Sequence, residues 1–297
     1  MKNPLAKGAR KLVDRYRVTE GKKFRLDDYD PADTAGLELD GKEAKKLLGE
    51  GVEKLADLQT KLYAQNCWGV LILLQAMDAA GKDGTIKHVM SGVNPQGVRV
   101  TSFKAPSAEE LDHDYMWRCV TRLPERGMIG IYNRSYYEEV LVVRVHPELL
   151  LAEHLPPRLL SKKGIWKQRY HDMNALESYL ARNGFLVLKF FLHISKEEQK
   201  RRLLARLDAP EKNWKFSLRD VQERGFWKDY MRAYEKMIAA TATEHAPWHV
   251  VPADNKWFTR LTVAATIVEA LQELGLRYPP IDPQRRRELA EARKALA

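Results

Sequence analysis

The chain has 297 residues and a formal net charge of +10, from 50 Lys and Arg against 40 Asp and Glu. Its length fits one large α/β domain with short extensions. With only Cys67 and Cys119 and no apolar run near the ~18 residues that span a membrane, it excludes a disulfide framework, a cysteine zinc site and a membrane-spanning protein.

The positive charge favours a polyanionic partner, although a basic surface that only keeps the protein soluble would give the same count. The first residues lack the apolar core of a signal peptide. We therefore expect a cytoplasmic protein.

Residues 1–40 are polar and rich in Asp and Pro, and we expect an irregular arm there. Apolar residues at helical spacing predict an amphipathic helix over 42–63. The run 68–75 is continuously apolar, which is typical of a central strand covered on both faces of a parallel sheet.

A loop over residues 76–84 follows this strand and opens a helix expected over 84–90. It resembles the phosphate-binding pattern G-x-x-x-x-G-K-[ST], but Ala76 and Asp83 stand where that pattern has Gly and Ser or Thr. Gly81 would let backbone N–H groups surround a phosphate, and Lys82 would add positive charge. Asp78 either holds a divalent cation or only forms the turn. Candidate phosphate contacts in and after the loop are Ala79, Ala80, Gly81, Asp83, Gly84, Thr85 and Lys87.

The middle of the chain predicts two more strands, 98–103 and 128–132. Between them, Ser107 and Glu110 form a capping-box pattern that opens a helix reaching Val120. A second polar cluster, 133–139, follows the strand 128–132. We expect a surface connection over 147–163 and a long helix over 165–182.

The last part of the chain predicts strands at 185–194 and 248–251. Helices are expected over 196–207, 218–240 and 257–274, and a charged helical tail over 281–297. Strands that alternate with helices five times predict one domain, 41–280, with a doubly wound parallel five-stranded sheet. Ligands bind such sheets beyond the carboxyl ends of the strands, where both polar clusters lie.

The 133–139 cluster offers phosphate and metal chemistry. Arg134 could fork onto phosphate oxygens, and Asn133 and Glu138 could organise a metal. Glu139 could help to position a nucleotide, and Arg144 in the helix that follows is a further candidate contact. An ordinary helix N-terminus with acidic residues is the alternative.

A basic, Trp-containing segment at about 200–225 suits a lid that closes on a polyanion, or else a solvated charged surface. Its candidate contacts are Arg206, Lys212, Lys215, Arg219 and Arg224.

Four segments together resemble the polyphosphate kinase 2 family: Met77-Asp-Ala-Ala-Gly-Lys-Asp-Gly-Thr, Gly92-Val-Asn-Pro-Gln-Gly-Val, Asn133-Arg-Ser-x-Tyr-Glu, and Arg206-Leu-Asp-x-Pro-x-Lys-x-Trp-Lys. The resemblance spans residues 20–275. It implies a P-loop kinase-like three-layer α/β/α core with a helical lid. It also implies transfer of the terminal phosphoryl group between inorganic polyphosphate and a nucleotide.

The resemblance assigns roles to residues of this chain. Asp78, Gly81 and Lys82 match the family's Walker A loop, Asn133 and Arg134 its Walker B region, and residues 206–219 its lid. The catalytic residues would be Asp78, Lys82 and Arg134, with Mg²⁺, or Mn²⁺ instead, held by Asp78 and Glu138. Asn133 resembles the class III subgroup, which phosphorylates both AMP and ADP.

The implied partners are polyphosphate and adenine nucleotides, with guanine nucleotides as a second option, in a dimer or tetramer. Two other functions remain open at this point. An ATP-dependent nucleotide kinase of the adenylate or thymidylate type would carry a standard phosphate-binding loop, which this chain lacks. A basic nucleic-acid-binding module would show basic residues interleaved with aromatics, and that pattern is weak here. We expect neither nucleic acid nor a membrane as a partner.

Overall fold

One six-stranded sheet forms the centre of the protein. The computed structural model describes residues 4–160 and 164–297, and their side chains except those of residues 4–9, 212 and 215. The strands lie in the order β1-β6-β5-β2-β4-β3, and all pairs are parallel except β1 with β6. Their bounds are β1 Arg17–Val18, β2 Gly69–Gln75, β3 Val98–Ser102, β4 Ile129–Asn133, β5 Phe185–His193 and β6 Trp248–Pro252.

The apolar run predicted as a central strand is β2, and each of its residues is buried. It pairs with β5 on one side, from Gly69 opposite Phe185, and with β4 on the other, from Val70 opposite Ile129. β2 and β4 therefore end side by side, with Leu74 opposite Asn133. The two polar clusters consequently meet at one edge of the sheet, as predicted.

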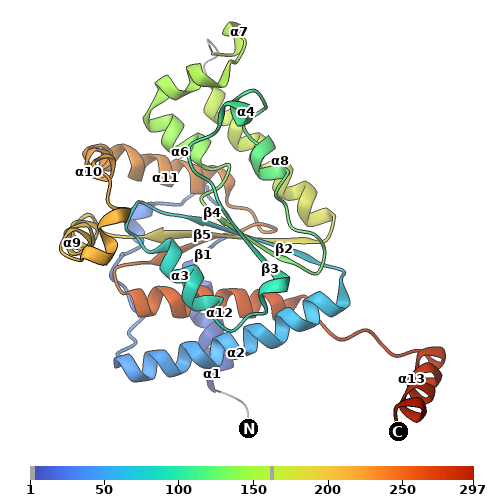
Figure 1. Ribbon diagram of the computed structural model, residues 1–297. Coiled ribbons are helices and arrows are strands. Elements are labelled where there is room, and N and C mark those ends of the chain that lie inside the picture. Colours follow the sequence, from blue (N-terminus) through green and yellow to red (C-terminus); the bar gives the residue numbers. More distant parts are fainter. Residues whose placement is uncertain (1–3, 161–163) are drawn as a thin grey trace.

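Helices cover both faces of the sheet (Figure 1). α1 (Pro4–Tyr16), α2 (Gly41–Gln65), α3 (Lys82–Val89) and α12 (Lys256–Glu273) pack together on one face. α6 (Glu138–Val145), α8 (Ile165–Arg182) and α11 (Trp227–Thr241) pack together on the other. The doubly wound three-layer core predicted from the sequence is confirmed.

The N-terminal arm is not irregular as predicted. α1 packs on α12, and β1 adds a sixth strand to the sheet, antiparallel to β6. Val13, Tyr16 and Val18 are buried by this packing. The prediction failed because these few apolar residues lie among many charged ones, so the helical pattern is weak.

Two long predicted helices are broken. The Ser107 capping box forms, but α4 (Ala108–Leu111) ends at once and α5 (Trp117–Val120) is a separate turn. The predicted helix 218–240 divides into α10 (Leu218–Glu223), the 3₁₀ turn Arg224–Phe226 and α11, with Gly225 inside the break.

The remaining elements are short or peripheral. α9 (Lys196–Leu207) is capped by Ser195, whose side chain accepts from the Glu198 amide. The expected surface connection holds the 3₁₀ turn Pro147–Glu153 and α7 (Pro157–Leu160), and its residues 161–163 lie outside the described part. Further 3₁₀ turns are Leu26–Asp28, Pro95–Gly97 and Pro210–Lys215.

α13 (Pro283–Leu296) is exposed throughout and lies apart from the core (Figure 1). This matches the solvated helical tail that was expected. In the described residues, none of the helices has the length and apolarity needed to cross a bilayer.

Candidate active site

The loop between β2 and α3 is held in an unusual backbone conformation. Ala79 has φ 63° and Gly81 has φ 108°. Gly81 carries no Cβ and adopts this conformation freely, whereas Ala79 pays about 1–3 kcal/mol in strain. α3 begins at Lys82, two residues earlier than predicted, so Lys82 and Asp83 lie in its first turn. Contacts from elsewhere in the fold must therefore hold the loop in place.

Arg202 on α9 supplies those contacts. Its side chain is buried, and Nη1 donates to the carbonyls of Ala79 (3.2 Å) and Ala80 (2.8 Å). Nη2 donates to the carbonyls of Ala253 (2.6 Å) and Asp254 (3.0 Å) after β6. Arg202 thus connects the loop after β2 to the segment after β6, which lies two strands away in the sheet.

The Lys82 ammonium group lies under the same loop. Nζ donates to the carbonyl of Ala76 at 2.7 Å, and the Met77 carbonyl lies 3.4 Å away. Burial, together with the Arg134 charge, lowers the pKa of Lys82 to about 8, while Asp78 and Glu138 oppose the shift. Lys82 is therefore a poorly hydrated cation close to the carboxyl end of β2, a position suited to an incoming phosphate.

Arg134 follows β4 and lies between two carboxylates. Nη2 contacts Asp78 Oδ1 at 2.7 Å and Nη1 contacts Glu138 Oε2 at 3.3 Å. The negative charge of Glu138 raises the pKa of Arg134. The Asp78 charge adds to this effect, whereas burial opposes it. Arg134 has φ 66°, a strained conformation, and its amide donates to the Leu74 carbonyl at 3.0 Å.

Asn133 links the two clusters at a second point. Its Nδ2 donates to Asp83 Oδ1 at 2.7 Å. An aspartate at position 133 would place a second carboxylate against Asp83, so the amide is electrostatically matched to this neighbour.

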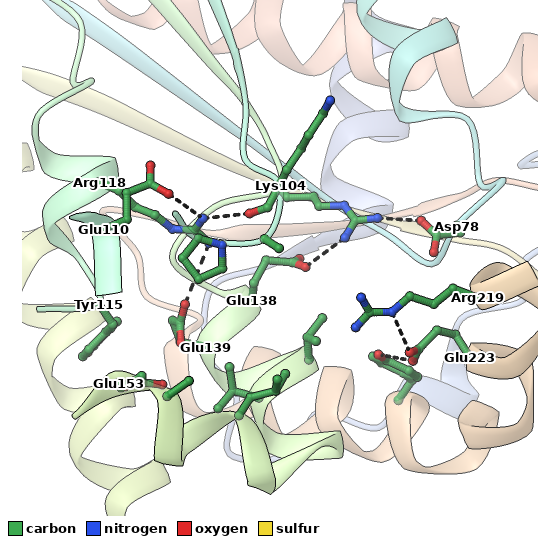
Figure 2. A pocket seen from close by; sticks show the side chains of 18 of the residues that line it. Asp78, Lys104, Glu110, Tyr115, Arg118, Glu138, Glu139, Glu153, Arg219 and Glu223 are labelled. Atoms are coloured by element: carbon green, nitrogen blue, oxygen red, sulfur yellow. Dashed lines mark hydrogen bonds and ion pairs between the residues drawn. The ribbon is translucent and has the colours of Figure 1, made fainter. Parts of the chain in front are cut away.

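A pocket of about 440 Å³ opens on the β4 side of the loop. Its wall carries charges of both signs, and we call it the mixed pocket. The lining includes Asp78, Lys104, Glu110, Arg118, Arg134, Glu138, Glu139, Glu153, Arg219, Asp220 and Glu223. Figure 2 shows Asp78, Arg118, Arg219 and Glu223 among these charged side chains around the cavity.

Glu139 lies in the wall of the mixed pocket, away from Asp78 (Figure 2). Arg169 Nη1 contacts Glu139 Oε2 at 3.3 Å, Arg118 Nη2 lies 3.9 Å from Oε1, and Arg169 also pairs with Glu153. Burial and the nearby Glu153 carboxylate raise the pKa of Glu139 to about 8, against both arginines. Glu139, which the sequence predicted to position a nucleotide, is thus a buried residue in the wall of the mixed pocket.

A second pocket of about 270 Å³ lies against the other side of the loop. Within the described residues its lining contains five cations and no carboxylate, and we call it the basic pocket. The lining residues are Ala79, Ala80, Gly81, Gly84, Thr85, Arg201, Arg202, Ala205, Arg206, Lys256, Thr259 and Arg260.

The lid arginines divide between the pockets. Arg206 lines the basic pocket and contacts Asp220 Oδ2 at 3.2 Å, whereas Arg219 lines the mixed pocket, 3.7 Å from Glu223 Oε1. Arg224 donates to the Lys196 carbonyl and to Gln199 Oε1, both at 2.8 Å, and lines neither pocket. The predicted lid contacts Lys212 and Lys215 have side chains outside the described residues.

Five other predicted site residues line neither of these pockets: Lys82, Asp83, Lys87, Asn133 and Arg144. Lys87 is exposed on α3 and Arg144 donates to the Tyr170 hydroxyl at 2.7 Å; neither lines a pocket. Sequence reasoning missed Lys256 and Arg260. The sequence could have indicated them, because they lie four residues apart at the start of the helix that follows β6, where ligands of such sheets bind.

Oxygen ligands for a divalent cation are present, but they are engaged with Arg134. Among the described residues, no group of three or more His, Cys, Asp or Glu is gathered as a metal site. Asp78 is partly exposed, and Mg²⁺ commonly binds through one or two carboxylates together with phosphates and water. Asp78 and Glu138 therefore fit such an ion once phosphates enter and draw Arg134 toward themselves.

Comparison with known proteins gives one consistent family. Residues 38–277 match the model of polyphosphate kinase 2. The chain is 51% identical to an ADP-polyphosphate phosphotransferase of Rhodopseudomonas palustris, over 95% of this chain and 97% of that protein. It is 45% identical to an AMP/ADP-polyphosphate phosphotransferase of Meiothermus ruber, over 90% and 96%.

A solved structure agrees with these relatives. The crystal structure of polyphosphate kinase 2 from Arthrobacter aurescens TC1 matches with a TM-score of 0.85 and 41% identity, over 95% of this chain and 96% of that one.

Proposed function

Because this chain belongs to the polyphosphate kinase 2 family, we propose that it transfers the terminal phosphoryl group of inorganic polyphosphate to AMP and ADP, reversibly. The observation that carries the proposal is the position of the loop between two unlike pockets. Residues 76–78 line one of them, and residues 79–81, 84 and 85 line the other. A phosphoryl group crossing the loop would pass from a donor site to an acceptor site.

The basic pocket suits the polyphosphate donor. A polyphosphate chain carries negative charge at each phosphate and offers no base or sugar to recognise, so a wall of Lys and Arg is sufficient to bind it. Lys256, Arg260 and Arg206 supply this charge from two helices. A carboxylate in such a wall would repel the chain, and the described lining contains none.

The mixed pocket suits the acceptor nucleotide. Its volume of about 440 Å³ is within the usual range for small-molecule sites. Arg134 and Arg219 can contact phosphate oxygens, while apolar and polar groups farther along the wall surround the base. The carboxylates of this wall distinguish it from the basic pocket, because they can accept hydrogen bonds from ribose hydroxyls and base amino groups.

The reaction needs positioning and charge neutralisation more than acid–base chemistry. An acceptor phosphate oxygen, already anionic, forms the new O–P bond, while the bond to the shortened polyphosphate breaks and that chain keeps the electron pair. Lys82 and Arg134 neutralise the charge that develops on the transferred group. For this, the Arg134 guanidinium must exchange the Asp78 carboxylate for phosphate oxygens.

Asp78, with Glu138, would hold Mg²⁺, with Mn²⁺ as an alternative. When bound, the ion would screen the charges of the two phosphates that meet at the loop. Asn133 would permit both AMP and ADP as acceptors, as in the class III members that this residue resembles.

The donor decides between this function and an ATP-dependent nucleotide kinase. Purified protein is incubated with Mg²⁺, ADP or AMP, and either long-chain polyphosphate or ATP, and product nucleotides are separated by chromatography. ATP should form from ADP, and ADP then ATP from AMP, with polyphosphate as donor. Phosphorylation of AMP from ATP, with no product from polyphosphate, would contradict the proposal.

A further inference from the structure

A fully buried ion pair lies in the core close to the site. Lys189 on β5 and Glu177 on α8 both have no exposed side-chain surface, and Nζ contacts Glu177 Oε2 at 2.6 Å. Lys189 interrupts an apolar run, residues 185–192, in its strand. The reaction described above uses neither residue.

Each charge of this pair is satisfied by further hydrogen bonds. Lys189 Nζ also donates to the Thr241 carbonyl at 2.7 Å and to the Tyr137 hydroxyl at 3.1 Å. Glu177 Oε1 accepts from the hydroxyls of Tyr136 (2.9 Å) and Tyr137 (2.7 Å). Burial and the Glu177 charge raise the pKa of both tyrosines, so their hydroxyls remain donors.

The two tyrosines belong to the turn that carries the candidate catalytic arginine. They occupy the positions between Arg134, which pairs with Asp78, and Glu138, which pairs with Arg134. Both aromatic rings are buried, and their hydroxyl groups connect this turn to Glu177 on α8 and Lys189 on β5. The turn needs such support because Arg134 has the strained φ of 66°.

Stability is a weak explanation for this pair. Apolar residues of similar volume commonly replace buried ion pairs without loss of stability, because removing both charges also removes their desolvation cost. An ion pair with four further hydrogen bonds to three residues instead fixes direction, since each bond must be met at a defined angle.

We propose that Glu177 and Lys189 are positioning residues for phosphoryl transfer: through Tyr136 and Tyr137 they hold the 134–138 turn so that Arg134 faces the reacting phosphates. The inference rests on the proposed role of Arg134. The pair touches no substrate and acts only through the turn.

Tyr137→Phe removes the hydroxyl that contacts both charges of the pair, while the Tyr136–Glu177 hydrogen bond and the Lys189–Glu177 contact stay in place. We expect kcat for ADP phosphorylation to fall about tenfold to a hundredfold, because small displacements of a catalytic group have effects of that size. The KM for ADP and the thermal unfolding midpoint should stay close to those of the control. The matched control is Tyr132→Phe, which also removes one buried hydroxyl. That hydroxyl donates a hydrogen bond to the Cys119 carbonyl at 2.6 Å and does not contact the ion pair.

A coupling measurement separates positioning from a general structural effect. Arg134→Lys keeps a positive charge but loses the fork, and Tyr137→Phe is repeated in that background. If the hydroxyl acts through Arg134, its effect on kcat should largely vanish there. The same fold-loss in both backgrounds, or a kcat for Tyr137→Phe within twofold of Tyr132→Phe, would overturn the inference.

Two further results complete the design. If Tyr137→Phe fails to fold, Glu177→Gln combined with Lys189→Met removes both charges together, and the same loss of kcat at unchanged KM is expected. Full kcat in that folded double variant would also overturn the inference. If Arg134→Lys alone keeps full activity, the proposed role of Arg134 fails, and with it the inference, whatever the tyrosine variants show.

Discussion

Lys82 lies in the first turn of α3, and its buried ammonium group donates to the backbone carbonyls of Ala76 and Met77. Burial disfavours its charged form, which is why its pKa falls to about 8. A phosphate in the loop would reverse this effect, since an adjacent anion stabilises the ammonium ion.

The protonation of Lys82 should therefore be visible in the pH dependence of transfer. Since the lysine must be charged, kcat/KM for polyphosphate should fall as the pH rises through about 8, the value in the free enzyme. The fall in kcat should come at higher pH, because bound phosphate raises the pKa.

Two variants of Lys82 provide the comparison. Lys82→Arg should lose the alkaline fall near pH 8, because a guanidinium stays charged. Lys82→Ala should lower kcat at least about a hundredfold with the fold intact. Lys82→Ala activity within a few-fold of the unmodified protein would show that this lysine does not contact the transferred phosphate.

Asn133→Asp tests the acceptor range. The new carboxylate would lie against Asp83, now 2.7 Å from the Asn133 amide, and the repulsion should displace one of the two side chains. We expect the ratio of kcat/KM for AMP to that for ADP to change by about tenfold or more, a difference of about 1.4 kcal/mol. Rates are measured with each acceptor separately. An unchanged ratio would show that Asn133 does not determine which nucleotide is phosphorylated.

At this scale, the sequence predicts residues whose chemistry is local. Gly81 and Lys82 follow a buried strand directly, and Arg134 follows another, so their nearness to the site could be deduced from chain order. Arg202, Lys256 and Arg260 reach the site from helices that lie far along the chain, and their direction depends on how those helices pack. Arg144 shows the opposite error, since a cation near a motif in sequence can point to another partner, here Tyr170.

Among the elements, α9 links the lid to the phosphate-binding loop. Arg202 donates four hydrogen bonds to main-chain carbonyls, whereas both it and the exposed Arg201 beside it donate to the Glu198 carboxylate. α9 thereby holds the strained Ala79 in position.

Arg202→Met should lower the free energy of unfolding by about 2–4 kcal/mol, because buried carbonyls lose their donors. Urea denaturation measures the change. The control, Arg201→Met, removes the neighbouring exposed cation and should change stability little. Equal effects of the two substitutions would show that the contacts to the loop do not stabilise the fold.

Some elements were predicted to the residue and others were not. The helices 165–182 and 196–207 have the predicted bounds, because the first ends at Asn183-Gly184 and the second begins after the capping residue Ser195. The segments 107–120 and 218–240 contain helix-compatible residues, apart from Gly225, yet each is divided. Side-chain contacts span the second break. Tyr230, for example, donates to Glu223 at 2.7 Å across the break between α10 and α11.

For the whole molecule, the net charge of +10 includes five cations that line the basic pocket. The lining of the mixed pocket contains carboxylates as well as cations, whereas the described lining of the basic pocket contains none. The total charge favoured a polyanionic partner without deciding between it and a basic surface that only keeps the protein soluble, and it could not show the division into two pockets. That division depends on helices from both faces meeting at one loop. The expected homo-oligomer stays a prediction.

The central claim is that donor and acceptor bind on opposite sides of the loop, and steady-state KM values for both substrates test it most directly. In the double variant Lys256→Ala with Arg260→Ala, the KM for polyphosphate should rise about tenfold or more, since each lost charged contact costs about 1.5–3 kcal/mol. The KM for ADP should stay within about twofold. Arg219→Ala, on the other side, should give the reverse pattern. Parallel changes in both KM values in either protein would contradict the account.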